Sequence, residues 1–222
     1  MKKILLIMTA LLFWNCTDYA GDWENNYGGI FGGDSGNGGY SKVAYGQMVD
    51  SRDGKSYRTI QIDNQVWMAE NLNHDNCPGD ACDGKGYCGS LSETCESFGR
   101  YYNWDGAMIA CPSGWHLPSV AEWKSLFSVI GEDDAVTKLR AQDGWADNNG
   151  LDTYGFSMLA AGSIRDDGGY YPMYQGVHVG FWTSTGGGYD TAYLLFNDYR
   201  ENAFQFAEDP KYRGFSVRCL KD

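Results

Sequence analysis

Cysteine is the residue type whose spacing most directly suggests chemistry in this 222-residue chain. Four of the seven cysteines lie close together: Cys77, Cys82, Cys88 and Cys95. Clustered thiolates can hold zinc, but zinc sites usually contain C-x2-C pairs. Here the first two cysteines are spaced C-x4-C and the last two C-x6-C, among Asp, Gly and Ser. The spacing therefore favours disulfides, which persist in exported proteins.

Two further cysteines, Cys111 and Cys219, complete an even set of six if Cys16 is set aside. We predict the pairs Cys77–Cys82, Cys88–Cys95 and Cys111–Cys219, although six cysteines allow fifteen pairings. The last pair would close a loop of 108 residues, 219 minus 111. In the chain-entropy model, such a closure stabilises the fold by on the order of 4–5 kcal/mol.

Histidine, serine and carboxylate groups give no comparable signal of catalysis. The three histidines, His74, His116 and His178, lie in no metal-ligand or triad pattern, and no Ser or Cys has a nucleophile signature. Asp166 and Asp167 could act as an acid and a base, but adjacent aspartates in a turn are usually solvated. We therefore expect no catalytic residue.

The segment from Asp50 to Gly54 is similar to the start of a calcium-binding loop, because Asp50 and Asp53 precede a glycine. The later acidic ligands of such a loop are missing, so a plain turn is favoured. We expect no cofactor. Abundant Asp and Asn in the later loops leave a structural calcium ion open, with no ligand set that the spacing identifies.

Tyrosine and asparagine are concentrated in the last third of the chain, in segments expected to be loops. These residue types suit recognition of glycans or proteins, because a rigid ring offers contact area and a polar tip. The alternative is that many of them only close the core of a long loop. The candidate ligand-binding residues are Tyr170, Tyr171, Tyr174, Tyr189, Asp190, Asn197 and Tyr199.

The element expected to position much of this chemistry is a helix over 119–130, directly after CPSGWHLP. Ser119 followed three residues later by Glu122 forms a capping box, and apolar residues follow at helical spacing. Trp115 to Leu117 alternates and predicts an extended segment before it. A first helix is expected over 98–110. Residues 131–153 are expected to be irregular, with Trp145 as an anchor.

Short runs of β-forming residues predict the strands. A hairpin is expected from residues 57–62 and 65–68, joined by Asp63-Asn64. A second hairpin is expected from residues 191–196 and 203–206. Further strands are expected at 156–161, 180–184 and 214–220, so Cys219 would attach the last strand to the helical region.

The N-terminus has the pattern of an export signal. Lys2 and Lys3 precede an apolar run of eleven residues from Ile4 to Trp14, too short to span a bilayer. Asn15 and Cys16 end this run, as at a bacterial lipoprotein cleavage site. We therefore expect a signal peptide over 1–15, a lipid on Cys16 and an acidic, Gly-rich tether over 16–45. An ordinary secretion signal with an incidental cysteine is the alternative.

Composition limits the class of partner. The formal net charge of -12 repels phosphate backbones, so nucleic acid is not expected as a partner. A length of 222 residues suits one domain with appendages, and 43% hydrophobic residues can fill its core.

Five blocks, in this order, resemble the Fibrobacter succinogenes major paralogous domain: DSRDGKSYRTIQIDNQVWMAENL, CGSLSETCESFGRYYNWDGAM, CPSGWHLPSVAEW, GFWTS and GFSVRCL. The resemblance runs from about Val49 to Leu220. It implies a branch of the C-type-lectin-like fold, in which the chain ends meet in a sheet and a long loop region carries function. It also implies an exported, often lipid-anchored protein.

The resemblance does not extend to two known activities. HLPSVAEW is similar to the helix start of the formylglycine-generating enzymes, which use a cysteine pair near their C-terminal part, where this chain has only Cys219. Sugar-binding C-type lectins hold calcium with Glu-Pro-Asn or Gln-Pro-Asp and Trp-Asn-Asp, and none of these triplets occurs.

These observations predict an α+β, C-type-lectin-like domain over 46–222, with two helices packed on short antiparallel sheets, a long loop region and disulfide staples. The expected function is a non-catalytic lipoprotein, anchored in the outer membrane by its lipid alone and displayed at the cell surface. Its expected partner is a glycan or an envelope or extracellular protein. A structural envelope protein without a small ligand, or a formylglycine-generating-type enzyme, are the alternatives.

Overall fold

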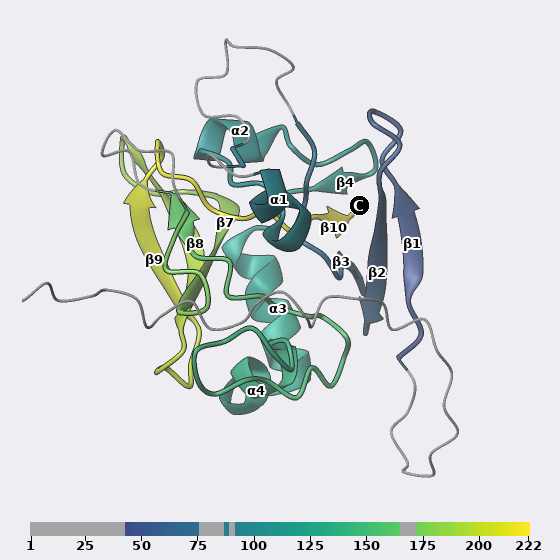
Figure 1. The fold of residues 1–222 in the computed structure, drawn as a ribbon, viewed down its shortest axis with the longest axis vertical. Coiled ribbons are helices and arrows are strands. Elements are labelled where there is room, and N and C mark those ends of the chain that lie inside the picture. Colours follow the sequence, from purple (N-terminus) through teal and green to yellow (C-terminus); the bar gives the residue numbers. More distant parts are fainter. Residues whose placement is uncertain (1–42, 76–86, 89–91, 165–171) are drawn as a thin grey trace, which may run out of the picture. The chain divides into compact units, whose positions relative to one another are not determined.

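The computed structural model describes residues 43–75, 87–88, 92–164 and 172–222. They lie in one compact unit, Lys42–Asp222. Its strands form a five-stranded sheet in the order β1-β2-β3-β10-β4, a three-stranded sheet β7-β8-β9 and a small pair β5-β6. In Figure 1 the two larger sheets lie on opposite sides of this unit, with α3 between them. The described part is an α+β fold with antiparallel sheets and short helices.

The five-stranded sheet brings the beginning and the end of this unit together. Its strands are β1 (Gly46–Val49), β2 (Ser56–Ile62), β3 (Gln65–Met68), β4 (Trp115–His116) and β10 (Leu220–Lys221). The predicted 57–68 hairpin and the extended segment before α3 are confirmed, while β1 was not predicted. Leu220 pairs with Trp67 on one side and His116 on the other.

The smaller sheets contain β5 (Ser163–Ile164), β6 (Pro172–Met173), β7 (His178–Gly186), β8 (Thr191–Asp198) and β9 (Gln205–Pro210). The predicted 191–206 hairpin and the 180–184 strand are confirmed, and their strands are longer than expected. The 156–161 prediction is wrong, because Ser157 has φ 52 and its N–H donates to the Asp152 side chain instead of a ladder. In the predicted 214–220 strand, Gly214, Phe215 and Ser216 form isolated bridges, and Leu220 belongs to β10.

The helices are α1 (Ser92–Phe98), α2 (Trp104–Met108), α3 (Val120–Ile130), the 3-10 turn η1 (Glu132–Asp134) and α4 (Ala135–Leu139). The 119–130 prediction is confirmed, including the reciprocal capping box between Ser119 and Glu122. The single helix over 98–110 is wrong. Gly99 has φ 75, Tyr101 pairs with Tyr87 in a β-bridge, and Asn103 caps a new helix.

Residues 132–139, expected to be irregular, are helical because Val136 and Leu139 bury a face against the core. Trp145 is buried as predicted and donates its indole N–H to the Met158 carbonyl at 3.0 Å. Among the described residues, no helix combines the length and the apolar character needed to cross a membrane.

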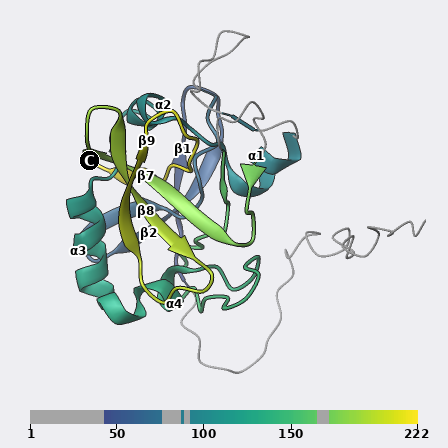
Figure 2. The ribbon, with the colours of Figure 1, turned by 90° about the vertical axis from the view of Figure 1, so that its left-hand side faces the viewer.

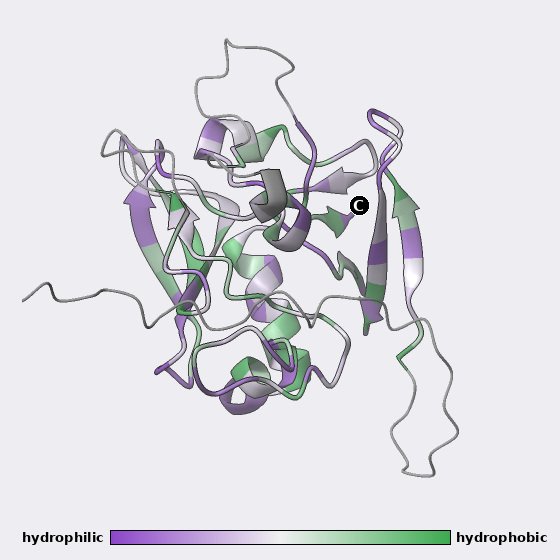
Figure 3. Ribbon diagram, viewed as in Figure 1, coloured by the Kyte–Doolittle hydropathy of each residue, from purple (hydrophilic) through white to green (hydrophobic). Residues whose placement is uncertain are grey.

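The core is built around α3. Trp123 of α3 packs on Trp67 of the five-stranded sheet at a ring-centroid distance of 4.5 Å and on Phe181 of β7 at 5.7 Å. Figure 3 shows polar and apolar bands interleaved along α3, as expected for a helix with one buried face. One helix therefore joins the two larger sheets.

Disulfides link Cys88 to Cys95 and Cys111 to Cys219, which confirms two of the predicted pairs. The second attaches the residue before β10 to the segment before β4, two neighbouring strands of one sheet. Cys16, Cys77 and Cys82 lie outside the described residues.

Two buried arginines that sequence analysis did not single out hold the loops in place. Arg140 donates to the Asn197 side chain at 2.9 and 2.5 Å and to the carbonyls of Asp198 and Glu201 at 2.7 and 3.0 Å. Arg218 donates to the Asn71 side chain at 2.9 Å and the Ser157 carbonyl at 2.6 Å. Each is 1% exposed, so these hydrogen bonds satisfy oxygens that water does not reach.

Candidate binding site

A pocket of about 400 Å³ opens on one face of the three-stranded sheet. We call it the His178 pocket. It combines aromatic rings, a histidine, an amide and an ion pair, and its lining consists of Ser163, Tyr174, His178, Leu194, Phe196, Gln205, Ala207, Asp209, Arg213 and Phe215. Its volume lies within the range of roughly 300–1,000 Å³ that is usual for small-ligand sites. Figure 2 shows the three-stranded sheet that carries much of it.

Strand alternation explains why the pocket forms on this face. Leu195 of β8 and Phe206 of β9 are paired and point toward the core, where Phe206 lies 6.2 Å from Phe127 of α3. The next pair along, Phe196 and Gln205, points to the opposite face because side chains alternate along a strand. One face of the sheet thus packs on the core around α3, and the other face contributes to a second hydrophobic cluster and to the pocket.

Gly180 of β7 leaves room on the pocket face. A Cβ at this position would collide with the ring of Phe215 and contact Leu194. The Phe215 ring packs edge-on against Trp182 at 5.0 Å and closes one end of this face. Phe215 is therefore shared between that aromatic pair and the lining of the pocket.

Three rings form a row along the pocket. The His178 ring lies 5.3 Å from Tyr174 and 5.2 Å from Phe196, measured between centroids. Tyr174 is 48% exposed. Its φ of 65 is a left-handed conformation that bulky residues rarely adopt. Such local strain is more frequent at functional sites than elsewhere.

The polar groups of the pocket are paired with one another. Arg213 donates from Nη1 to Oδ2 of Asp209 at 3.0 Å, and both side chains are half-buried. The His178 Nε2 lies 3.2 Å from the Ser163 hydroxyl. Burial lowers the pKa of His178, and the Asp198 carboxylate opposes this shift only in part. His178 is therefore neutral at pH 7.

Of the seven predicted ligand-binding residues, Tyr174 lines this pocket. Asn197 is 1% exposed and accepts hydrogen bonds from Arg140, so its side chain serves packing. Tyr199 is half-buried beside the guanidinium of Arg200, 5.4 Å from the ring centroid. Of these three residues, one therefore lines the pocket, one is buried and one is half-buried outside the pocket.

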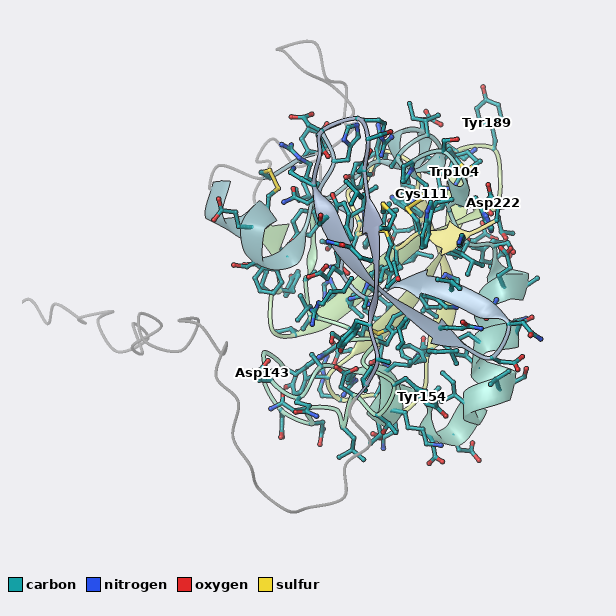
Figure 4. All side chains as sticks on the ribbon, turned by 90° about the vertical axis from the view of Figure 1, so that its right-hand side faces the viewer. Trp104, Cys111, Asp143, Tyr154, Tyr189 and Asp222 are labelled. Carbon is teal, nitrogen blue, oxygen red and sulfur yellow. A yellow bond between two sulfur atoms is a disulfide. The ribbon has the colours of Figure 1, made fainter. Side chains whose placement is uncertain are left out.

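Tyr189 and Asp190 lie in the connection between β7 and β8, outside the pocket. Tyr189 is fully exposed and projects away from the body of the domain (Figure 4). Tyr170 and Tyr171 lie outside the described residues, as do Asp166 and Asp167. The pocket residues His178, Gln205, Asp209 and Arg213 were not predicted, because their proximity depends on strand register and on the return of the chain after β9.

The Asp50–Gly54 segment, considered above as the start of a calcium-binding loop, is a turn stabilised by an arginine. Asp50, Asp53 and His74 place one ligand atom each within 4.8 Å of one another. However, Arg52 donates to both carboxylate oxygens of Asp50, at 2.8 and 2.6 Å. Burial opposes ionisation, but the Arg52 hydrogen bonds and charge keep the pKa of Asp50 low. A cation would have to displace Arg52, so these residues fit the predicted turn better than a metal site.

His116 joins three elements of the fold. Its Nδ1 lies 2.6 Å from Asp222, and its Nε2 lies 2.8 Å from Glu122 of α3. Burial opposes protonation, but the two carboxylates outweigh it and raise the pKa of His116. Because both ring nitrogens contact carboxylates, His116 links β4 to the start of α3 and to the end of β10.

Among the described residues, each histidine ring has hydrogen-bond partners of its own. His74 contacts Asp53, His116 contacts Glu122 and Asp222, and His178 contacts Ser163. The disulfide with Cys111 also leaves Cys219 without a free thiol.

Comparison with known proteins identifies one family. The family model described as Fibrobacter succinogenes major domain (Fib_succ_major) matches residues 60–221. That range includes α3, both described disulfides and every lining residue of the His178 pocket. No curated protein and no solved structure matches the chain.

Proposed function

We propose, from the premise that the chain belongs to the Fibrobacter succinogenes major domain family, that it is a non-catalytic binding protein whose His178 pocket holds part of a glycan. The observation that carries the proposal is the pocket itself. An exposed tyrosine ring packs at a tilt against a neutral histidine, beside an amide and an arginine–carboxylate pair. Sugars need this combination, because they present apolar C–H faces and many hydroxyl groups.

The rings suit a sugar better than a peptide chain. Tyr174 offers a flat face at the pocket mouth. Gln205 has an amide that can both donate and accept, and Asp209 and Arg213 present an acceptor and donors side by side. An extended peptide would instead add to a sheet edge through its main chain. If envelope proteins bind the pocket and polysaccharides do not, the partner is a protein instead.

We also propose that the domain is a C-type-lectin-like fold. Pairing of β10 with β3, the Cys111–Cys219 link and helix α3 between two antiparallel sheets support this assignment. The three-stranded sheet with its pocket would then correspond to the loop region that carries function in that fold.

The proposed location is the outer membrane, with a lipid on Cys16 and the domain displayed at the cell surface. The basic, apolar and cysteine segments of the first sixteen residues support it. Mass spectrometry of the mature protein from its own host tests this directly. A diacylglycerol-modified Cys16 at the N-terminus is expected, and a mature protein that begins elsewhere or lacks the lipid would refute the anchor.

Binding is tested with immobilised glucan, galactan, mannan and polygalacturonate, using the full chain. Wild type should bind at least one polysaccharide, and Tyr174→Ala should weaken that binding at least tenfold. Tyr189→Ala is the matched control, since it removes an exposed tyrosine outside the pocket. Equal binding by wild type and Tyr174→Ala, or no binding to any polysaccharide, would reject the glycan function.

A further inference from the structure

We infer that the His178 pocket selects an uncharged sugar unit and excludes acidic sugars such as uronic acids. This inference rests on the glycan-binding function proposed above and adds the charge class of the ligand. It follows from how the charged groups of the pocket are paired.

Among the lining residues that the structure describes, Arg213 is the only permanent cation, and Asp209 already neutralises it at 3.0 Å. The Arg213 and Asp209 side chains are 28% and 20% exposed, so water screens their attraction little. A ligand carboxylate would have to compete with Asp209 for the guanidinium. It would also bring a second negative charge next to Asp209.

His178 does not supply the missing positive charge. Its ring is buried between Tyr174 and Phe196, and burial lowers its pKa, so it is neutral at pH 7. The nearest charge acting on the ring is the carboxylate of Asp198, which is also negative. Moving a carboxylate from water into such surroundings is unfavourable unless a free cation meets it.

An uncharged sugar does not incur this cost. Its hydroxyl groups can donate to Asp209 and accept from Arg213 while the ion pair stays intact. The amide of Gln205, which is exposed, can serve a further hydroxyl. The net charge of -12 acts in the same direction, because it repels acidic polysaccharides before they reach the pocket.

The first experiment needs no variant. The neutral polysaccharide whose binding depends on Tyr174 is compared with its C6-oxidised derivative, in which carboxylates replace the primary alcohols of the same backbone. Binding of the oxidised form should be at least tenfold weaker at 0.15 M salt. Equal or tighter binding of the oxidised form, or Tyr174-dependent binding of polygalacturonate above all neutral polysaccharides, would overturn the inference.

The second experiment reverses the preference. Asp209→Asn removes the carboxylate and frees Arg213, so the oxidised polysaccharide should gain affinity relative to the neutral one by at least tenfold. Glu208→Gln is the matched control, since it removes the neighbouring carboxylate of β9 outside the pocket. An unchanged ratio in folded Asp209→Asn protein contradicts the charge argument. Loss of Tyr174-dependent binding to every polysaccharide instead rejects the proposed function itself.

Discussion

Removing the two described disulfides one at a time should have very different effects on stability. The Cys111–Cys219 bond joins residues 108 apart, whereas the Cys88–Cys95 bond joins residues 7 apart. In the chain-entropy model a disulfide limits the unfolded chain more when the loop it closes is longer. The longer bond should therefore contribute about 4.8 kcal/mol and the shorter one about 2.4 kcal/mol.

The two pairs are well matched as variants. Each joins one buried and one half-buried cysteine, since Cys219 is 0% and Cys95 4% exposed while Cys111 and Cys88 are intermediate. Replacing both members of either pair by alanine therefore removes similar side chains. What differs is the loop length, and the expected gap between the two double variants is about 2.4 kcal/mol.

The assay is urea unfolding of the full chain under non-reducing conditions, followed by tryptophan fluorescence, with the unfolding free energy extrapolated to water. Cys111→Ala/Cys219→Ala should unfold at a distinctly lower urea concentration than Cys88→Ala/Cys95→Ala. If the two variants lose the same stability, or the short-loop variant loses more, loop closure is not the main contribution of these bonds.

Three further predictions concern single side chains. His116 has a raised pKa, so its stabilisation is complete below about pH 6.5 and is lost as pH rises through the folded pKa. The advantage of wild type over His116→Asn should fall by roughly 0.2–1 kcal/mol between pH 5.5 and 8.5, and a constant difference contradicts this assignment. The unfolding free energy of Tyr174→Gly should exceed that of Tyr174→Ala by about 1–2 kcal/mol, because glycine tolerates positive φ. Equal urea midpoints for the two variants would exclude backbone strain. Arg140→Met should lower the unfolding free energy by on the order of 2–4 kcal/mol, because it leaves buried oxygens without donors. In the same denaturation assay, exposed Arg200→Met should lower it by under about 1 kcal/mol, and equal losses would contradict the role of Arg140.

Much of the local structure follows from short-range signals. The capping box of Ser119 and Glu122 places the start of α3 in the sequence and in the structure alike. The 57–68 hairpin and the strands on either side of the 199–204 connection also follow from alternation and turn residues. These elements depend on contacts among residues a few positions apart, which sequence patterns represent directly.

Elements that depend on distant partners were predicted poorly. The 98–110 segment has helical spacing, but Tyr101 and Tyr102 form bridges with Tyr87 and Phe215, and that pairing breaks the helix in two. The 156–161 segment has strand composition, yet Arg218 binds the Phe156 and Ser157 carbonyls, and Met158 forms an isolated bridge with Arg140 instead of a ladder. In both cases a contact from far along the chain overrides local propensity.

The candidate site divides in the same way. The sequence by itself determined the residue classes available for binding and the acidic charge that disfavours nucleic acid, and it predicted two disulfide pairs that the structure confirms. Only the tertiary structure decided that Tyr174 joins His178, Asp209 and Arg213 while Asn197 is buried beneath Arg140. The physical reason is the two-residue period of a strand: Phe196 and Asn197 are neighbours in sequence but point to opposite faces of one sheet.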